Sequence, residues 1–124
     1  MTATAFVQRS FPEPFDQVLI DKLLSKWSIG DERCGVILVG GTILELTNGM
    51  DDPSHSFGLL QEEIEDVFRA YGKDSIAAVW HTHPNNKTRP SEEDREGWPT
   101  GSLRYLIVTQ SEVAEWANPF DRLY

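Results

Sequence analysis

The chain has 124 residues, 40% of them hydrophobic, which is enough for a buried core, and we expect residues 1–124 to form a single domain. Its 20 acidic and 11 basic residues give a formal net charge of −9, so the field of the protein repels phosphate polymers and anionic lipid surfaces. This balance excludes nucleic acid and membranes from the expected partners.

The apolar runs and the cysteine content narrow the class of protein further. The apolar runs are too short to span a bilayer, and the first residues, MTATAF, lack the basic start and apolar core of a signal peptide. We therefore expect a soluble protein that is cytoplasmic where it is made. Cys34 is the single cysteine, so a metal site would have to use nitrogen and oxygen ligands.

The first half of the chain predicts a helix, a hairpin and a second helix. After a weak strand pattern in TAFVQRSF, a helix is expected from about residue 14 to 26, where one stripe is apolar: Phe15, Val18, Leu19, Leu23, Leu24 and Trp27. Two β-rich runs separated by a Gly-Gly pair predict a hairpin over 34–47. The second helix is expected over 60–72, from the helical spacing of Leu60, Ile64, Val67, Phe68 and Tyr71.

The second half predicts strands around a polar loop and a short helix. SIAAVWHTH is apolar almost without alternation, which is typical of an inner strand covered on both faces. A polar loop, a short helix that begins at Ser91, and a strand over 103–109 follow, and VAEWA is expected to pair as a last strand. The order of elements predicts an α/β sandwich built on one mixed sheet.

Two histidines lie one residue apart at the end of the predicted inner strand. Because side chains alternate along a strand, His81 and His83 point to one face and Thr82 to the other. Two imidazoles at this spacing are able to bind one ion, each through a ring nitrogen at about 2.0–2.1 Å, and zinc then needs a third protein ligand. Without an ion, the pair would bury two polar rings that each need a partner. The pair therefore predicts a metal site.

Asp94 is the candidate third ligand. Ten residues separate it from His83, and the loop PNNKTRP is long enough to bend the helix that begins at Ser91 back over the strand end. The letters SEED are also a helix-capping pattern, in which Ser91 caps and Asp94 reaches back from the third helical position. Taken alone, these four residues fit capping as well as ligation, and the two are compatible.

Hydrolysis at such a metal also needs a base that takes the proton of the attacking water. Glu32 is the candidate, because DERCG comes directly before an apolar strand that we expect beside the histidine strand. Most glutamates at such a position are solvated, and Asp31 would serve equally well. Position in the sequence leaves the choice between these two carboxylates open.

ERCG followed by HTHPNNKTRPSEED resembles the signature of the JAB/MPN (JAMM) metalloproteases. That signature has an upstream glutamate, then His-x-His-Pro, then Ser-x-x-Asp with ten residues between the second histidine and the aspartate. The strings DDPSHSFGL, IAAVWHTHP, RPSEEDREGWP and LRYLIVT are similar to the JAMM domain of phage tail-tip assembly proteins of the lambda K type, over about residues 31–109. The resemblance implies a JAB/MPN-like, cytidine-deaminase-like α/β sandwich, with a curved mixed β-sheet flanked by helices.

The resemblance also implies roles for individual residues. It implies Zn2+ held by His81, His83 and Asp94, with Glu32 as the acid/base residue. It further implies that the Ser91 hydroxyl polarises the scissile carbonyl. Together these roles imply a zinc-dependent peptidase or isopeptidase.

Several settings are compatible with such a peptidase. The first is a phage or prophage tail protein, associated with the virion tail, that acts on other tail proteins or on peptidoglycan peptides. The alternative within the enzymes is a peptidase for the tails of ubiquitin-like or sulfur-carrier proteins. A non-catalytic MPN-like scaffold, which binds partners through its acidic surface, is the rival from another class.

Overall fold

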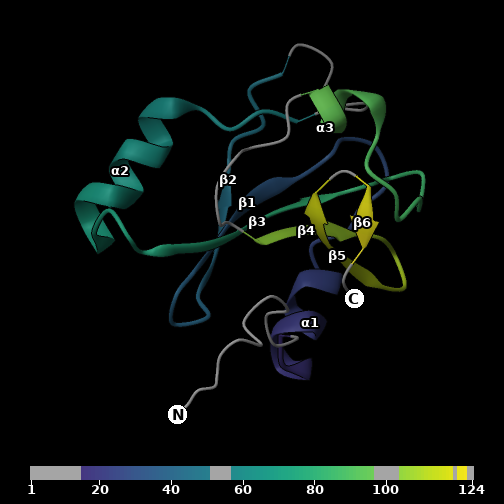
Figure 1. Cartoon of the computed structure of the whole chain (residues 1–124), viewed down its shortest axis with the longest axis horizontal. Helices are drawn as coiled ribbons and strands as arrows, with labels where there is room; N and C mark the ends of the chain where they lie inside the picture. The colour runs from purple at the N-terminus through teal and green to yellow at the C-terminus, as the bar shows by residue number, and fades with distance from the viewer. Residues whose placement is uncertain (1–14, 51–56, 97–103, 119, 123–124) are drawn as a thin grey trace.

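The structure, a computed structural model, describes residues 15–50, 57–96, 104–118 and 120–122. In these residues, six strands form one open mixed sheet in the order β2-β1-β3-β4-β5-β6, with three helices around it (Figure 1). The helices are α1 (Gln17–Leu24), α2 (Gln61–Tyr71) and α3 (Glu92–Glu96). The strands are β1 (Cys34–Leu38), β2 (Ile43–Leu46), β3 (Ile76–Thr82), β4 (Arg104–Val108), β5 (Val113–Asn118) and β6 (Asp121–Arg122).

The histidine strand β3 lies inside the sheet, as predicted. It pairs antiparallel with β1, where Cys34 lies opposite His81, and parallel with β4, where His81 lies opposite Ile107. The hairpin predicted over 34–47 is confirmed as β1 and β2, and the predicted last strand pairs antiparallel with β4 as β5. The two-residue strand β6 extends the sheet beyond the prediction.

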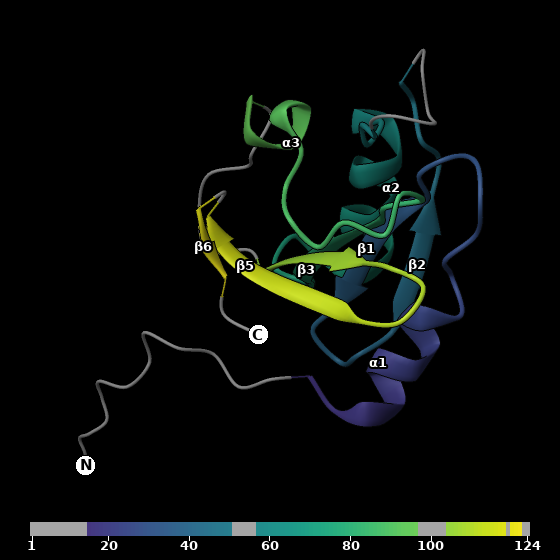
Figure 2. The same ribbon diagram turned by 90° about the vertical axis from the view of Figure 1, so that its right-hand side faces the viewer.

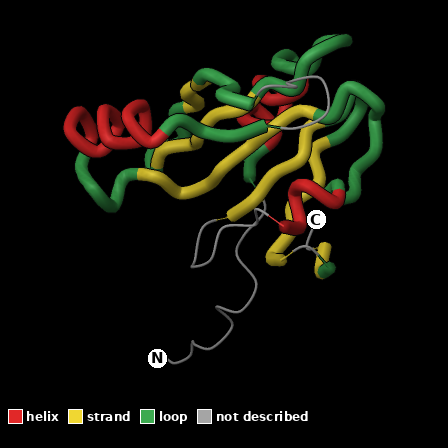
Figure 3. The backbone as a smooth tube through the Cα atoms, turned by 90° about the horizontal axis from the view of Figure 1, so that it is seen from above, coloured by secondary structure: helices red, strands yellow, loops and turns green. Residues whose placement is uncertain are grey.

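Helices cover both faces of the sheet. Leu19 and Leu23 of α1 pack with Trp80, whereas Val67 of α2 packs with Val79. Because Trp80 and Val79 are neighbours in β3, their side chains point to opposite faces, and so α1 and α2 lie on opposite faces. Figure 2 shows α3 on the same side as α2, and Figure 3 shows the strands bending along their length. The predicted α/β fold with a curved mixed sheet is confirmed.

The first helix is shorter than predicted and buries a narrower stripe. It begins after Asp16, whose carboxylate accepts a hydrogen bond from Leu19 N at 2.9 Å, and it ends at Leu24. Leu19 and Leu23 are buried, but Val18, predicted on the same stripe, is 64% exposed. The buried residues of this eight-residue helix, Leu19 and Leu23, lie on one i, i+4 line, so the neighbouring apolar residue Val18 faces solvent. The weak strand pattern in TAFVQRSF lies outside the described residues.

The second helix has nearly the predicted bounds, and its apolar residues differ in burial. Gly72 ends it with φ at 104°, a conformation that favours glycine. Of the residues whose spacing predicted the helix, Val67 is buried, but Phe68 and Tyr71 are 37% and 56% exposed. The helix contacts the sheet through only part of its apolar stripe. No helix in the described part of the chain has the length and apolar character to cross a membrane.

Candidate metal centre

The end of β3 turns two imidazoles toward one point, on the face of the sheet that α2 covers. His81 is fully buried, His83 is 3% exposed, and their Nε2 atoms lie 2.9 Å apart. Thr82 faces the other way, and its Oγ1 accepts a hydrogen bond from Arg33 N at 2.8 Å. The alternation predicted from the sequence is therefore confirmed.

The short helix α3 brings Asp94 to the histidine pair. Asp94 Oδ2 lies 3.1 Å from His81 Nε2 and 3.1 Å from His83 Nε2. The same oxygen accepts a hydrogen bond from Ser91 N at 2.9 Å, and Ser91 Oγ accepts one from Asp94 N at 3.0 Å. This reciprocal pair is a capping box. Capping and convergence on the histidines thus occur together at one carboxylate.

Glu32 reaches the cluster from the residues just before β1. Thr82 N donates a hydrogen bond to Arg33 O at 2.8 Å, which places the preceding residue beside the end of β3. Glu32 is 5% exposed, and its Oε1 lies 4.0 Å from His81 Nε2. Asp31 is exposed and does not belong to the group of four buried potential ligands. The structure therefore brings Glu32, and not Asp31, to the histidines.

The potential ligand atoms of this group carry too few protons to satisfy one another by hydrogen bonds, so a cation among them fits better. His83 Nδ1–H donates to the Lys87 carbonyl at 2.7 Å, which sets the tautomer and leaves a lone pair on His83 Nε2. Asp94 Oδ2 also offers lone pairs, and His81 Nε2 has at most one proton to share between these two acceptors.

A tetrahedral zinc ion would supply the missing positive charge at a suitable distance. Ligand atoms at about 2.0–2.1 Å from zinc lie roughly 3.3 Å from one another. The three donor atoms of His81, His83 and Asp94 are 2.9–3.1 Å apart in the structure. These residues therefore fit Zn2+ as a three-ligand set.

Burial and hydrogen bonding control the protonation of the three residues. Burial lowers the pKa of His81, and its contact with Asp94 offsets only part of this effect. Burial also lowers the pKa of His83, but hydrogen bonds with Asp94 and the Lys87 carbonyl outweigh it, so that this pKa is raised. Burial raises the pKa of Asp94, yet the two histidines hold it well below its usual range. These directions favour an anionic Asp94 and a neutral His81, the forms that bind metals, whereas a metal has to displace the proton that the raised pKa favours on His83 Nε2.

Aromatic rings form an apolar wall on one side of the cluster. Phe57 stacks on His81 with ring centroids 4.1 Å apart, and Tyr105 meets the same imidazole edge-on at 5.5 Å. Burial raises the pKa of the Tyr105 hydroxyl above its usual value. Cys34 is fully buried, and burial raises its pKa to about 12, so it is a small core residue rather than a thiolate ligand. The wall lowers the local dielectric and strengthens the electrostatic interactions of the cluster.

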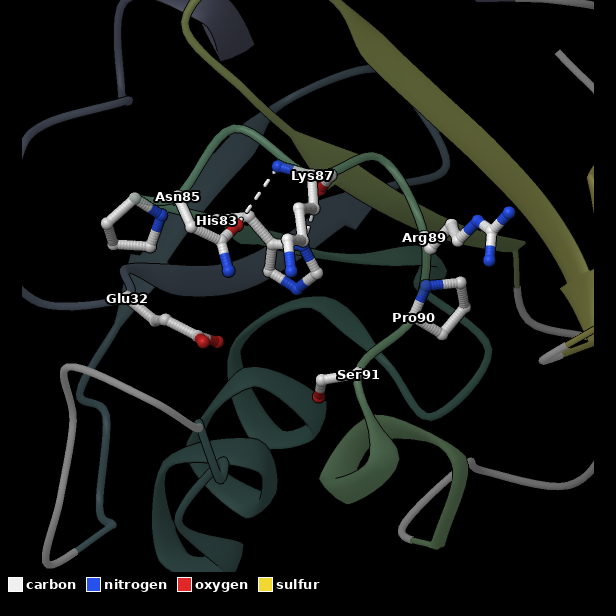
Figure 4. A pocket seen from close by; sticks show the side chains of 8 residues that line it. Glu32, His83, Asn85, Lys87, Arg89, Pro90 and Ser91 are labelled. Atoms are coloured by element: carbon white, nitrogen blue, oxygen red, sulfur yellow. Dashed lines mark hydrogen bonds between the residues drawn. The ribbon is translucent and has the colours of Figure 1, made fainter.

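An open cavity of about 550 Å³ leads to the cluster. Glu32, His83 and Ser91 line it together with the loop after β3, and Figure 4 shows Glu32 and Ser91 on different sides of the His83 ring. The five residues singled out in the sequence thus surround one site: Glu32, His81, His83, Ser91 and Asp94. Their ligand and catalytic roles remain predictions. The sequence reasoning missed Phe57, Tyr105 and the Lys87 carbonyl, because contacts between distant segments leave no local pattern.

Residues 24–119 match the family of prokaryotic homologues of the JAB domain. The match spans most of the chain and includes every residue of the cluster. The chain belongs to the prokaryotic JAB family. The predicted JAB/MPN relationship is therefore confirmed, and this JAB domain carries a buried Glu, His, His and Asp group that could hold a metal.

Two solved structures are similar to this JAB domain. The solution structure of protein DSY2949 from Desulfitobacterium hafniense has a TM-score of 0.61 at 22% identity, and the match covers 81% of this chain and 80% of that one. The solution structure of a protein from Salinibacter ruber has a TM-score of 0.41 at 18% identity, over 82% of this chain and 75% of that one. No curated protein matches the chain. The first likeness supports the fold.

Proposed function

We propose that this JAB domain is a zinc-dependent amide hydrolase that cleaves a peptide or isopeptide bond. The observation that supports the proposal is the cluster itself, in which three donor atoms lie 2.9–3.1 Å apart. Glu32 Oε1 is set back, 4.0 Å from His81 Nε2. This separation exceeds that of neighbouring ligands around one zinc ion, so His81, His83 and Asp94 would hold the ion and Glu32 would stay free to act as a base.

In this proposal, Glu32 acts as the base. Zinc, when bound by His81, His83 and Asp94, supplies a Lewis acid and lowers the pKa of coordinated water toward ~7. Glu32 takes a proton from the attacking water while the oxygen of that water bonds to the carbonyl carbon. The C–N bond then breaks, and Glu32 gives the proton to the leaving amine. Its buried position keeps the carboxylate aimed at the site rather than solvated.

The Ser91 hydroxyl acts as a hydrogen-bond donor to the carbonyl oxygen. Its oxygen accepts the Asp94 N–H at 3.0 Å, which leaves the hydroxyl hydrogen available to substrate. Ser91 also lines the cavity that Glu32 and His83 share. Loss of one such donor in comparable sites costs about 10²–10³ in rate. Ser91 therefore combines capping of α3 with stabilisation of the developing oxyanion.

We propose a peptide or protein tail as the substrate. The strings that resemble phage tail-tip proteins support tail proteins or peptidoglycan peptides, in a phage or prophage setting. The JAMM signature alone supports the alternative, the tail of a ubiquitin-like or sulfur-carrier protein. Both settings use the same five residues, and the neighbouring genes distinguish them: tail-tip genes favour the first, and a ubiquitin-like or sulfur-carrier gene favours the second.

Zinc dependence separates the hydrolase from the non-catalytic scaffold. We expect the purified chain to hold one zinc ion and to cleave amide bonds in a fluorogenic peptide library. Cleavage should stop after treatment with a chelator and return when zinc is added back. Zinc content by mass spectrometry and turnover are measured on the same samples. A chain that carries one zinc ion and cleaves no peptide or isopeptide substrate would contradict the proposal.

A further inference from the structure

Two cations that form no ion pair with any described residue lie beside the proposed reaction centre of a protein whose net charge is −9. Lys87 and Arg89 belong to the loop between β3 and α3; both are exposed and both line the cavity. Neither forms an ion pair with a described residue. By contrast, Arg33 and Arg104 each donate two hydrogen bonds to a glutamate of a neighbouring strand. The charges of the loop are therefore available to a ligand.

The backbone of this loop is fixed on the site. The Lys87 carbonyl accepts a hydrogen bond from His83 Nδ1 at 2.7 Å, and the Thr88 carbonyl accepts one from Trp116 Nε1 at 2.9 Å. Lys87 N donates to Asn85 Oδ1 at 3.0 Å. A candidate metal ligand and a strand of the sheet thus hold the segment that carries both cations. A ligand that binds them does not have to order the loop, which lowers the entropic cost of binding.

The cations occupy a defined place relative to the catalytic candidates. Figure 4 shows Glu32 on one side of the His83 ring and Arg89 on the other. Lys87 and Arg89 both line the cavity, whereas Thr88 between them does not. A substrate in this cavity therefore meets a wall to which both positively charged residues contribute.

We propose that Lys87 and Arg89 bind a carboxylate of the substrate, close to the amide bond that is cleaved. The inference rests on the proposed function, because it names the substrate class of that site. The guanidinium of Arg89 matches the two oxygens of a carboxylate, and Lys87 adds a point charge. The rest of the protein has a negative field that repels an acidic peptide. An acidic peptide therefore binds most favourably when its carboxylate lies at this loop. An Asp or Glu side chain and a C-terminal carboxylate present the same chemistry.

Binding of synthetic peptides, measured apart from cleavage, tests the inference. The zinc-loaded protein is titrated with acetyl-Gly-Gly-Glu-Gly-Gly-amide and its Gln counterpart, and with acetyl-pentaglycine as free acid and as amide. Dissociation constants come from backbone amide chemical shifts in residues 84–90. We expect at least one acidic peptide to bind about 5-fold more tightly than its neutral partner, with a preference that shrinks as salt is added.

Two variants assign the preference to the loop. The double variant Lys87→Gln, Arg89→Gln keeps the backbone carbonyl that holds His83, so it should retain zinc and lose the preference. The matched control is Lys73→Gln, which removes an exposed cation just after α2 that does not line the cavity. It should bind both members of each pair as the unmodified protein does.

Each outcome of the titrations has a defined meaning. Preference for the Glu peptide assigns a side-chain carboxylate, and preference for the free acid assigns a C-terminal one. Equal binding of acidic and neutral peptides would overturn the inference. So would a preference that persists in the double variant, since the carboxylate would then be bound by the metal. Turnover of a peptide library on the same samples tests the proposed function separately. Cleavage without a preference for acidic peptides refutes only the inference about the loop. A loop-dependent preference without any cleavage refutes only the proposed hydrolysis.

Discussion

Asp94 Oδ2 takes part both in the cap at the start of α3 and in the candidate metal site. It accepts the Ser91 N–H at 2.9 Å and lies 3.1 Å from Nε2 of both histidines. The capping box holds the carboxylate in the orientation that ligation requires, so little rotamer freedom is lost when a metal binds. A substitution at Asp94 therefore affects the helix start and the proposed metal affinity together.

Replacement of this carboxylate tests its role as a ligand. Asp94→Ala leaves two of the three proposed ligands, so we expect zinc affinity to fall by at least ~100-fold, measured by competition with a chelator of known affinity. The control is Glu92→Ala, which removes an exposed acid from the same short helix. An Asp94→Ala protein that binds one zinc ion as tightly as the control would reduce Asp94 to a capping residue.

Ser91 has two proposed roles that respond differently to substitution. Ser91→Ala should lower the free energy of unfolding by about 0.5–2 kcal/mol through loss of the cap. It should also slow turnover by about 10²–10³ in protein that is folded and loaded with zinc. Ser91→Asp restores a capping oxygen but not a neutral donor, so stability should return while turnover stays low. Full turnover in zinc-loaded Ser91→Ala would leave Ser91 with the structural role alone.

The residues around the site differ in how far the sequence predicts them. Strand alternation suffices to place His81 and His83 together, because the period of two does not depend on the rest of the fold. Glu32 and Asp31 are equivalent by position, and the backbone pairing of Arg33 with Thr82 turns only the glutamate inward. That pairing joins residues far apart in sequence, which no local pattern encodes.

Among the glycines in the described part of the chain, Gly35 of β1 leaves the least room for a side chain. A Cβ built on Gly35 would lie 1.9 Å from the Leu44 carbonyl oxygen of β2 and 2.9 Å from Trp80 Nε1 of β3. Three strands thus approach one another at a position that accepts no side chain. Gly35 is therefore required for the close approach of β1 to β2 and β3, and β1 begins two residues after Glu32.

A single methyl group at this position should open the sheet. We expect Gly35→Ala to lower the free energy of unfolding by about 2 kcal/mol or more, since β1 or β2 must shift to relieve the overlap. Gly40→Ala is the control, because a Cβ there meets no atom within 4 Å. Chemical denaturation measures the free energy of unfolding of both variants. Equal stability of the two variants would show that the strands at Gly35 adapt without cost.

Helix burial is the property of the elements that the sequence predicts least well. The periodicity of α1 and α2 identifies the apolar face correctly, since Leu23 and Val67 are buried. It does not reveal how much of that face the sheet covers, and Val18, Phe68 and Tyr71 remain exposed. Coverage depends on the width of the sheet beneath each helix, which is a property of the tertiary structure.

In the whole molecule, the topology of the sheet places the site. β3 and β4 are parallel, so the chain has to cross over between them, and α3 belongs to this crossover. The crossover begins at the end of β3 and thus carries Ser91 and Asp94 back toward the histidines, while β1 brings Glu32 from the antiparallel side. Ligands often bind at the ends of central strands in α/β folds, and the candidate metal site of this JAB domain lies at such a place.

Substitution of Glu32 tests the central claim that this arrangement hydrolyses amides. Glu32→Gln keeps the size of the side chain but cannot accept a proton at neutral pH, whereas Asp31→Asn makes the same chemical change at the exposed neighbour. Zinc content and peptide turnover are measured on each zinc-loaded sample. We expect both variants to bind one zinc ion, Glu32→Gln to turn over at least ~100-fold more slowly, and Asp31→Asn to match the unmodified protein. Near-normal turnover by zinc-loaded Glu32→Gln would contradict Glu32 as the base and the proposed mechanism with it.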